Sequence, residues 1–283
     1  MSAMSEEIRV TVLVENTVNV GRLTAEHGLA YAIQAGGGHI LLDTGQTDIS
    51  VHNSGTLGVN LAEVDTVVLS HGHYDHTGGL RHILPLAPRA QIYLHPDALA
   101  AKYTRNPDGS SRFIGMMREI AFQLRDSPLA HWTTQPTEIG HGIFVTGPIP
   151  RKTSYEDVGG AFYLDENCLQ PDALLDDQAL FFESQQGIHV ILGCAHAGVV
   201  NTLQYIQQIV GGKSIYSVMG GMHLLSASPE RLDRTISALR QIGVQRLGPG
   251  HCTGFSAAAA LWSAFPGKCF SCSTGSQFSF HGD

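Results

Sequence analysis

Three histidines and an aspartate stand within six consecutive residues of the chain, as His71, His73, Asp75 and His76. Imidazole nitrogen and carboxylate oxygen at this density suit a divalent ion such as Zn²⁺, Fe²⁺ or Mn²⁺. In a loop that leaves a strand, His71 and His73 can point the same way while the next turn directs Asp75 and His76 to a second point. A histidine-rich surface loop without an ion is the alternative, and the order of these residues behind an apolar strand argues against it. The segment therefore predicts a cradle for metal ions.

A buried strand must carry the chain into this loop. Residues 64–70, Val-Asp-Thr-Val-Val-Leu-Ser, are mostly β-branched or apolar, which is typical of a strand covered on both faces. Gly72, Gly78 and Gly79 let the backbone bend tightly around an ion because glycine has no Cβ atom. The loop is thus expected between a core strand and a helix that begins after Gly79.

Strand-length apolar runs alternate with helix-length amphipathic segments along the rest of the chain. Strands are expected at residues 8–14, 28–34, 39–43, 91–94, 142–146, 178–182, 188–192, 215–219, 245–247 and 277–280. Helices are expected at residues 200–209, 229–242 and 256–265, and the glycines at 36–38 predict a hairpin turn. Hairpins followed by βα units, twice over, predict two sheets packed face to face with helices outside, a four-layer αββα sandwich of the α/β class.

One segment, residues 99–137, departs from this pattern. It carries turn-forming residues at 106–111 and then a helical pattern of apolar residues over 116–124. We expect it to be an insertion or lid over a pocket rather than part of a sheet. The chain is otherwise expected to form a single domain over residues 1–283.

The composition and the charge of the chain limit its partners. With 283 residues, 43% of them hydrophobic and 15% charged, the chain can build a substantial core. The net charge of −8 at pH 7 argues against nucleic acid and anionic membrane, because both attract an excess of Lys and Arg. An anionic small-molecule substrate remains open, since a bound cation can reverse the field inside a pocket.

Export and membrane insertion are not expected. The first seven residues lack a basic segment followed by an apolar run, and no apolar stretch approaches the ~20 residues that cross a bilayer. The five cysteines are an odd and scattered set, which does not resemble a disulfide framework. A soluble, cytoplasmic protein is expected.

Several motifs resemble those of one known superfamily. The run His71-X-His73-X-Asp75-His76, followed by Thr-Gly-Gly-Leu, resembles the signature loop of the metallo-β-lactamase superfamily. Residues 41–45, Leu-Leu-Asp-Thr-Gly, resemble its early Asp-Thr-Gly, where the aspartate, here Asp43, supports the metal loop without binding the ion. Gly250-His251 resembles its last histidine motif, a ligand of the second metal. The resemblance implies a metallo-β-lactamase fold and a site for two divalent ions, zinc first, with iron or manganese as alternatives.

Within the superfamily the chain resembles one subgroup. The subgroup is related to 7,8-dihydropterin-6-methyl-4-(β-D-ribofuranosyl)-aminobenzene-5'-phosphate synthase. The segments that carry this resemblance are residues 12–18, 41–47, 146–151, 193–198, 220–223 and 250–254.

The chain departs from the superfamily pattern at two ligand positions. A third histidine for the first metal site usually comes from a Pro-Gly-His loop, and residues 146–151 read Thr-Gly-Pro-Ile-Pro-Arg instead. A bridging aspartate usually follows a glycine, and the pair here is Gly193-Cys194. His196 is our candidate for the missing third ligand. Cys194 is either a bridging thiolate or a small buried hydrophobe.

The remaining histidines and cysteines carry weaker signals. His223 follows a Gly-Gly pair at a strand end, so metal binding and pocket lining are both open. No spacing ties His95, His131 or His141 to the cluster, and surface or core positions are expected for His27, His39, His52, His82, His189 and His281. The Cys-X-X-Cys spacing of Cys269 and Cys272 has no second pair to complete a zinc ribbon, which favours chance.

The resulting hypothesis is a metal-dependent hydrolase that acts on an ester, lactone, amide or phosphoester of a small molecule. The two expected ligand sets are His71, His73 and His196, and Asp75, His76 and His251. Asp75 is also expected to be catalytic, by orienting the attacking water. Arg151 is a candidate anchor for an anionic group because guanidinium pairs bidentately with carboxylate or phosphate, with an ordinary surface arginine as the alternative.

Three other functions remain open. The subgroup implies a pterin-type transferase that joins a dihydropterin pyrophosphate to a ribofuranosylaminobenzene phosphate. Some relatives of this fold perform redox chemistry with iron. A metal-binding sensor without turnover is the alternative outside enzymes. The oligomeric state is not indicated by the sequence.

Overall fold

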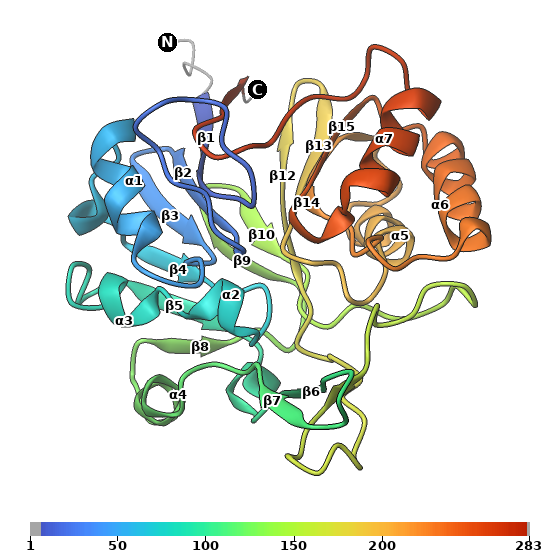
Figure 1. Ribbon diagram of the computed structural model, residues 1–283. Helices are drawn as coiled ribbons and strands as arrows, with labels where there is room; N and C mark the ends of the chain where they lie inside the picture. Colours follow the sequence, from blue (N-terminus) through green and yellow to red (C-terminus); the bar gives the residue numbers. More distant parts are fainter. Residues whose placement is uncertain (1–6, 282–283) are drawn as a thin grey trace, which may run out of the picture.

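Two β-sheets pack face to face at the centre of the molecule, and helices cover the outer face of each sheet (Figure 1). The computed structural model describes residues 7–281. Met1–Glu6, which belong to the segment read for an export signal, therefore lie outside the described residues. The expected four-layer αββα sandwich is confirmed. Within residues 7–281 no helix is long and apolar enough to span a membrane.

The first sheet has seven strands. In spatial order they are β16 (Gln277–His281), β1 (Glu7–Val14), β2 (Ala30–Ala35), β3 (Gly38–Leu42), β4 (Thr66–Val68), β5 (Gln91–Leu94) and β8 (Ala130–Trp132). Strands β3, β4, β5 and β8 run parallel, and the others pair antiparallel. The β2–β3 hairpin turns at Gly36 and Gly37, whose φ angles of 54° and 81° suit glycine. The hairpin predicted from the glycines is thus confirmed.

The second sheet has six strands. In spatial order they are β15 (Arg246–Gly250), β14 (Ile215–Gly221), β13 (Gly187–Leu192), β12 (Ala179–Ser184), β10 (Ile143–Val145) and β9 (Thr137–Gly140). Strands β13, β14 and β15 are parallel and joined by helices, while β9, β10, β12 and β13 pair antiparallel. Because β13, β14 and β15 are parallel, their carboxyl ends lie at the same edge of the sheet. Ligand sites of α/β proteins form at this edge.

Three apolar clusters hold the four layers together. Between the sheets, Ile33 and Val10 of the first pack with Phe182 and Met219 of the second. The outer face of the first sheet is covered by α1 (Ile49–Leu57), α3 (Leu80–Ile83) and α4 (Arg118–Arg125), and that of the second by α5 (Val199–Ile209), α6 (Pro229–Ile242) and α7 (Phe255–Ala264). One-turn helices complete the chain: α2 (Tyr74–Thr77), η1 (Leu61–Glu63), η2 (Pro96–Leu99) and η3 (His251–Thr253).

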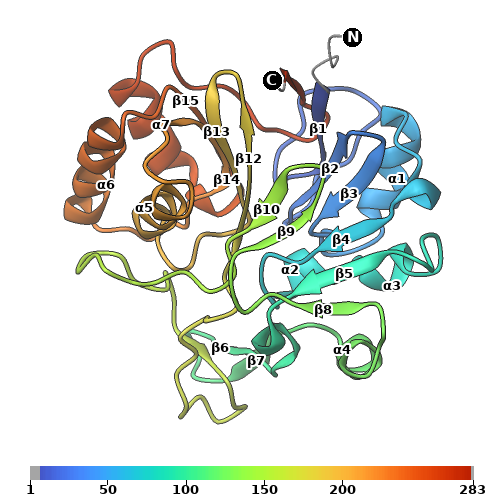
Figure 2. The same cartoon turned by 180° about the vertical axis from the view of Figure 1, so that it is seen from behind.

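The segment 99–137 is built differently from the expectation. It contributes β8 to the edge of the first sheet, where β8 pairs parallel with β5, so the expectation that the segment stays outside the sheets was wrong for β8. Three residues with mixed burial carry too little periodicity to be recognised as a strand. Strands β6 (Tyr103–Arg105) and β7 (Ser111–Phe113) join β11 (Phe162–Tyr163) in a small separate sheet, seen below the sandwich in Figures 1 and 2.

A buried histidine in the second sheet leads to a prediction on stability. The His189 imidazole lies between two serine hydroxyls, 2.7 Å from Ser184 Oγ and 2.7 Å from Ser217 Oγ, and burial lowers its pKa to about 4. Below pH 6.5 the unfolded chain binds a proton at this position that the folded chain does not bind. The free energy of unfolding should therefore fall as the pH is lowered from 6.5 to 4. In His189→Gln the slope of this free energy against pH should be smaller, by an amount that corresponds to at most one bound proton. Urea denaturation across this pH range measures it, and equal slopes in both proteins would contradict it.

Candidate metal centre

The expected ligands lie where four strands end. Strand β4 leads into His71, β13 into Cys194 and His196, β14 into His223, and β15 into His251. Strand β4 of the first sheet and strands β13, β14 and β15 of the second are thus followed by loops that meet between the sheets. The ends of these strands therefore bring the expected ligands together.

The first expected ligand set comes together in the structure. The ligand atoms of His71, His73 and His196 lie within 4.8 Å of one another, and all three side chains are buried. The Nε2 atoms of His73 and His196 have no hydrogen-bond partner among the described residues. Buried polar atoms without partners are rare because each costs free energy unless something binds it. This arrangement fits a cation between the three rings.

The second expected set also converges. The His76 and His251 Nε2 atoms are 3.2 Å apart, and Asp75 Oδ2 lies 3.4 Å from His251 Nε2 and 3.6 Å from His76 Nε2. His251 has a positive φ of 50°, and its backbone N–H donates to Glu15 Oε1 at 2.6 Å. The glutamate thus fixes the backbone that directs the His251 ring at Asp75.

Cys194 lies between the two sets. Its Sγ atom is 3.2 Å from His76 Nε2, and it forms one possible ligand group with His71 and His76 and another with His251 and Cys252. Burial raises the pKa of the Cys194 thiol, but a bound cation stabilises the thiolate and opposes this effect. Of the two readings of Cys194, the geometry favours the bridging ligand over a cysteine that only fills core space.

The protonation of the cluster fits a cation as well. Burial lowers the pKa of His71 and His196, and that of His73 to about 3, so these imidazoles stay neutral with free lone pairs. Burial acts in the same direction on His76, yet Asp43 and Asp75 raise its pKa to about 9. Two buried carboxylates thus require positive charge here, and a metal ion can replace the proton. The donor set therefore fits the group that the sequence implies.

Asp43 occupies the supporting position expected for it. Its Oδ2 atom is 2.6 Å from His76 Nδ1 and accepts the Ser70 hydroxyl, while Oδ1 accepts the Ser70 backbone N–H. A carboxylate on the far nitrogen of a metal-binding histidine fixes the tautomer and the ring orientation. His76 therefore presents Nε2 to the centre.

A buried lysine with two aspartate partners supports the backbone of the metal loop at Gly72. The Gly72 backbone N–H donates to Asp176 Oδ2 at 2.7 Å, and Asp176 Oδ1 accepts from Lys102 Nζ at 3.0 Å. Lys102 is fully buried and also pairs with Asp172 at 2.8 Å. A Cβ atom on Gly72 would lie 2.3 Å from the Ala98 carbonyl oxygen, so only glycine fits. The sequence does not indicate the role of Lys102, because its partners Asp172 and Asp176 are 70 and 74 residues away.

Arg151 has a different role from the one expected. Its guanidinium donates to the backbone carbonyls of His196 and Ala173, each at 2.6 Å. The guanidinium N–H groups that we expected to bind an anionic substrate thus hold the loop that carries His196. The expectation of Arg151 as a substrate anchor is corrected to a support for His196. On the same loop, the Ala197 N–H donates to Asp177 Oδ2 at 2.7 Å.

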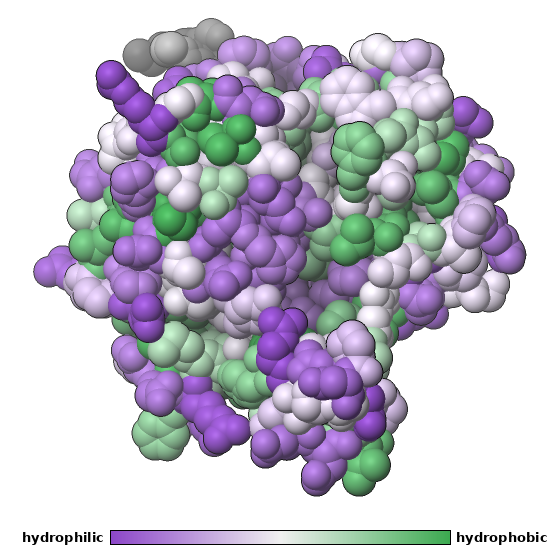
Figure 3. Space-filling view, viewed as in Figure 1, coloured by the Kyte–Doolittle hydropathy of each residue, from purple (hydrophilic) through white to green (hydrophobic). Residues whose placement is uncertain are grey.

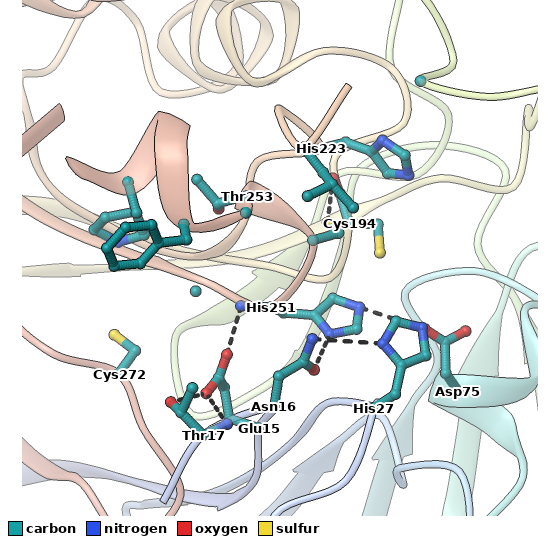
Figure 4. Close-up of a pocket in the computed structure, with 18 of the residues that line it drawn as sticks. Glu15, Asn16, Thr17, His27, Asp75, Cys194, His223, His251, Thr253 and Cys272 are labelled. Carbon is teal, nitrogen blue, oxygen red and sulfur yellow. Dashed lines mark hydrogen bonds and ion pairs between the residues drawn. The ribbon is translucent and has the colours of Figure 1, made fainter. Parts of the chain in front are cut away.

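Asn16 and His27, neither proposed from the sequence as site residues, support the second set (Figure 4). Asn16 Oδ1 lies 2.8 Å from His251 Nδ1 and accepts the Gly28 N–H, so Asn16 Nδ2 is the atom facing His27 Nδ1 at 3.4 Å. This amide orientation places a proton on Nδ1 of His251, which leaves its Nε2 lone pair for a metal. It also makes His27 Nδ1 an acceptor, so His27 Nε2–H donates to Asp75 Oδ2 at 3.2 Å.

The other histidines and cysteines are placed as follows. The His223 ring lies 4.3 Å from that of His196, centroid to centroid, and lines the adjoining cavity, but no possible ligand group among the described residues includes it. This geometry favours pocket lining over metal binding. His95 accepts the Asp97 N–H and His131 bonds to Gln91, both outside the centre. The five cysteines are free thiols, and Cys272 lines the cavity.

A cavity of about 830 Å³ opens onto the centre, and the space-filling surface is hollowed between the two halves of the sandwich (Figure 3). His27, His73, Asp75, His196 and His251 line one end of it. This volume is in the range of small-molecule sites. The cradle is thus accessible to a substrate of that size.

With this fold and this site, the chain can be compared with known proteins. The family model of the metallo-beta-lactamase superfamily matches residues 23–200, which is more than half of the chain. The chain belongs to the metallo-beta-lactamase superfamily.

Two relatives and one solved structure are similar over most of their length. A 7,8-dihydropterin-6-methyl-4-(beta-D-ribofuranosyl)-aminobenzene-5'-phosphate synthase of Methanocaldococcus jannaschii is 28% identical over 265 residues, 89% of this chain and 90% of the relative. Uncharacterized protein MJ0448 of the same organism is 30% identical over 256 residues, 89% of this chain and 93% of the relative. The crystal structure of Tm1679, a metal-dependent hydrolase of the beta-lactamase superfamily, superposes with a TM-score of 0.82 at 30% identity and covers 96% of this chain and 98% of that one.

The first ligand set gives a prediction on metal content. The chain should bind close to two divalent ions, and His196→Ala should weaken binding at the first set by roughly tenfold or more, because one of three protein ligands is lost. Elemental analysis and titration against a chromogenic chelator measure both. His223→Ala is the matched control, a histidine beside His196 outside the ligand groups, and should bind like the wild type. A normal titration for His196→Ala with a weakened one for His223→Ala would exchange their roles.

The Asn16 amide gives a prediction on the second set. Asn16→Leu keeps the size but removes the hydrogen bonds to His251 and His27, so affinity at the second set should fall by roughly tenfold, as is usual when a support of a ligand is lost. The His251 ring should also no longer be held in the Nδ1–H tautomer, and its ¹⁵N chemical shifts should report this change. Asn19→Leu is the control, because Asn19 bonds to Ser273 outside the ligand groups. Unchanged affinity and an unchanged tautomer in Asn16→Leu would refute the assignment.

Proposed function

We propose that this chain is a metal-dependent hydrolase that uses a metal-activated water on an ester, lactone or phosphoester of a small molecule. The observation that carries the proposal is that Cys194 forms possible ligand groups with His71 and His76 and with His251, in the lining of an open cavity. Two divalent ions occupy these sets. We propose zinc, because a cysteine thiolate among imidazoles favours it over manganese, with iron as the alternative.

The residues around the cradle divide the work of hydrolysis. Divalent ions held by these residues would supply a nucleophilic water near neutral pH and polarise the electrophilic oxygen of the substrate. Asp75 would bind the second ion with one carboxylate oxygen and orient the attacking water. His27 donates to Asp75 Oδ2 and so keeps that carboxylate in place. Phe162, whose ring lies 5.0 Å from that of His73 and 5.3 Å from that of His196, limits access of bulk water to the first set.

A second candidate function is a pterin-type transferase, favoured by the similarity to the Methanocaldococcus jannaschii synthase over 89% of this chain. There the same cradle would stabilise a departing pyrophosphate. Incubation with a dihydropterin pyrophosphate and ribofuranosylaminobenzene phosphate, followed by mass spectrometry of the products, separates the two. A joined product identifies the transferase, and hydrolysis alone identifies the hydrolase.

Asp75 provides the test of the hydrolase. Asp75→Asn keeps the size and one oxygen but removes the charge, so the fold should survive. If Asp75 orients the attacking water, kcat should fall by about a hundredfold or more, and KM should change much less, because the lost interaction is made mainly in the transition state. Steady-state kinetics on the best substrate of a screen over phosphodiesters, lactones and thioesters measure the effect.

Metal content must be determined on the same Asp75→Asn sample. Near wild-type turnover with both ions retained would make Asp75 a structural residue of the loop. A wild-type protein that turns over none of the screened substrates yet binds them in a metal-dependent way would favour the sensor.

A further inference from the structure

Helix α7 is apolar on two opposite faces. Ala257 and Leu261 are buried against the second sheet. On the other side, Phe255, Ala258, Ala259 and Trp262 recur at helical spacing and line the cavity. A helix on the surface of a globular protein normally turns polar residues outward. The outward face of α7 therefore lacks the polarity that solvent contact alone would favour.

The two aromatic side chains on this face are exposed to an unusual degree. Phe255 is 89% and Trp262 is 48% exposed, and neighbouring Leu225, which packs beside Gly254 at the start of α7, is 70% exposed. Large apolar side chains gathered at one place mark binding sites. In Figure 3 apolar side chains gather to the right of the central hollow, on the half that contains α7 in Figure 1.

The shape of this face suits a flat group. Phe255 and Trp262 are seven residues apart, which is about 10 Å along a helix. The two alanines between them leave a shallow recess with aromatic side chains at both ends. A group of one or two fused rings matches this length and can contact both aromatic side chains. Arg112 is the single Lys or Arg among the described residues that line the cavity, and it lies beside Tyr74 of the metal loop. Among the described lining residues, α7 and Leu225 thus bring no cationic side chain to pair with an anionic group.

We propose that the α7 face, together with Leu225, is a subsite for a flat, uncharged aromatic portion of the substrate. The proposal rests on the proposed function, in which the reacting bond lies at the metal centre. The continuity of the cavity supports a small-molecule occupant, because the same cavity is lined by Phe255 and Trp262 and by Asp75 and His251. A second copy of the chain or a partner protein on this face would cover residues that line the same cavity as the ligands.

Two non-hydrolysable phosphonates test the subsite without requiring turnover. Naphthylphosphonate and methylphosphonate share the metal-binding group and differ in the ring system. Isothermal titration of the metal-replete chain should give at least tenfold tighter binding of the naphthyl compound, in the range expected for stacking on two aromatic side chains. Phe255→Ala and Trp262→Ala should each lower this preference several-fold and leave methylphosphonate affinity unchanged. Phe122→Ala is the matched control, an aromatic residue of α4 that is 69% exposed and lies outside the cavity lining, and it should keep the full preference.

The outcomes separate the subsite from the hydrolase. Equal affinity for both phosphonates in the wild type, or a preference that survives in Phe255→Ala/Trp262→Ala with normal fold and metal content, would overturn the subsite. So would an oligomer that dissociates in these variants, measured by sedimentation, with the ring preference unchanged. Ring preference without hydrolysis of any naphthyl ester or phosphoester would support the subsite and reject the hydrolase. Hydrolysis without ring preference would do the reverse.

Discussion

The rest of the structure depends on the burial of several imidazoles, a thiol and two carboxylates around one point. Neutral imidazoles present lone pairs that face one another, and the Asp43 and Asp75 carboxylates add negative charge in a region shielded from water. Such a cluster is unfavourable by itself, because the groups would otherwise be hydrated. Cations bound between the two ligand sets would offset this cost for the ligands directly and for Asp43 through His76. Metal binding therefore contributes to the stability of the fold around the centre as well as to its chemistry.

This constraint explains why the supporting residues come from distant parts of the chain. Asp43 fixes the His76 ring, Asn16 fixes His251, Arg151 holds the backbone of His196, and Asp176 holds that of Gly72. Each contact restrains either the ring of a ligand or the backbone of a loop that carries a ligand. The orientation of the ligands is thus set by hydrogen bonds from loops that adjoin strands of both sheets.

Patterns within one segment of the sequence predict the helices, strands and turns that form within that segment. The β-branched run before His71, the glycines of the β2–β3 turn and the periodicity of α6 each lie within one segment, and the structure has these elements close to where the sequence places them. The supporting contacts could not be predicted in this way. Asn16 and His251 are 235 residues apart, and nothing in the pattern of either segment indicates the other.

Arg151 shows a second reason for failure. The sequence identifies a cation near the site but cannot tell whether its guanidinium faces the substrate or the backbone carbonyls of a neighbouring loop. Charge and motif position are the same in both cases. Only the packing of the His196 loop against residues 173–174 decides between them.

The two ends of the cavity differ in how firmly the fold determines them. At the metal centre, Asp43, Asn16 and Arg151 each bond to a ligand or its backbone, so a substitution there disturbs the ligand as well as its support. At the α7 end, Phe255 and Trp262 are exposed, while the buried face that carries Leu261 attaches the helix to the core. Exposed side chains outside a core can be exchanged at a small cost in stability. Substrate preference can therefore change on α7 while the cradle and its chemistry are retained, which suits a fold that serves many substrates with one metal centre.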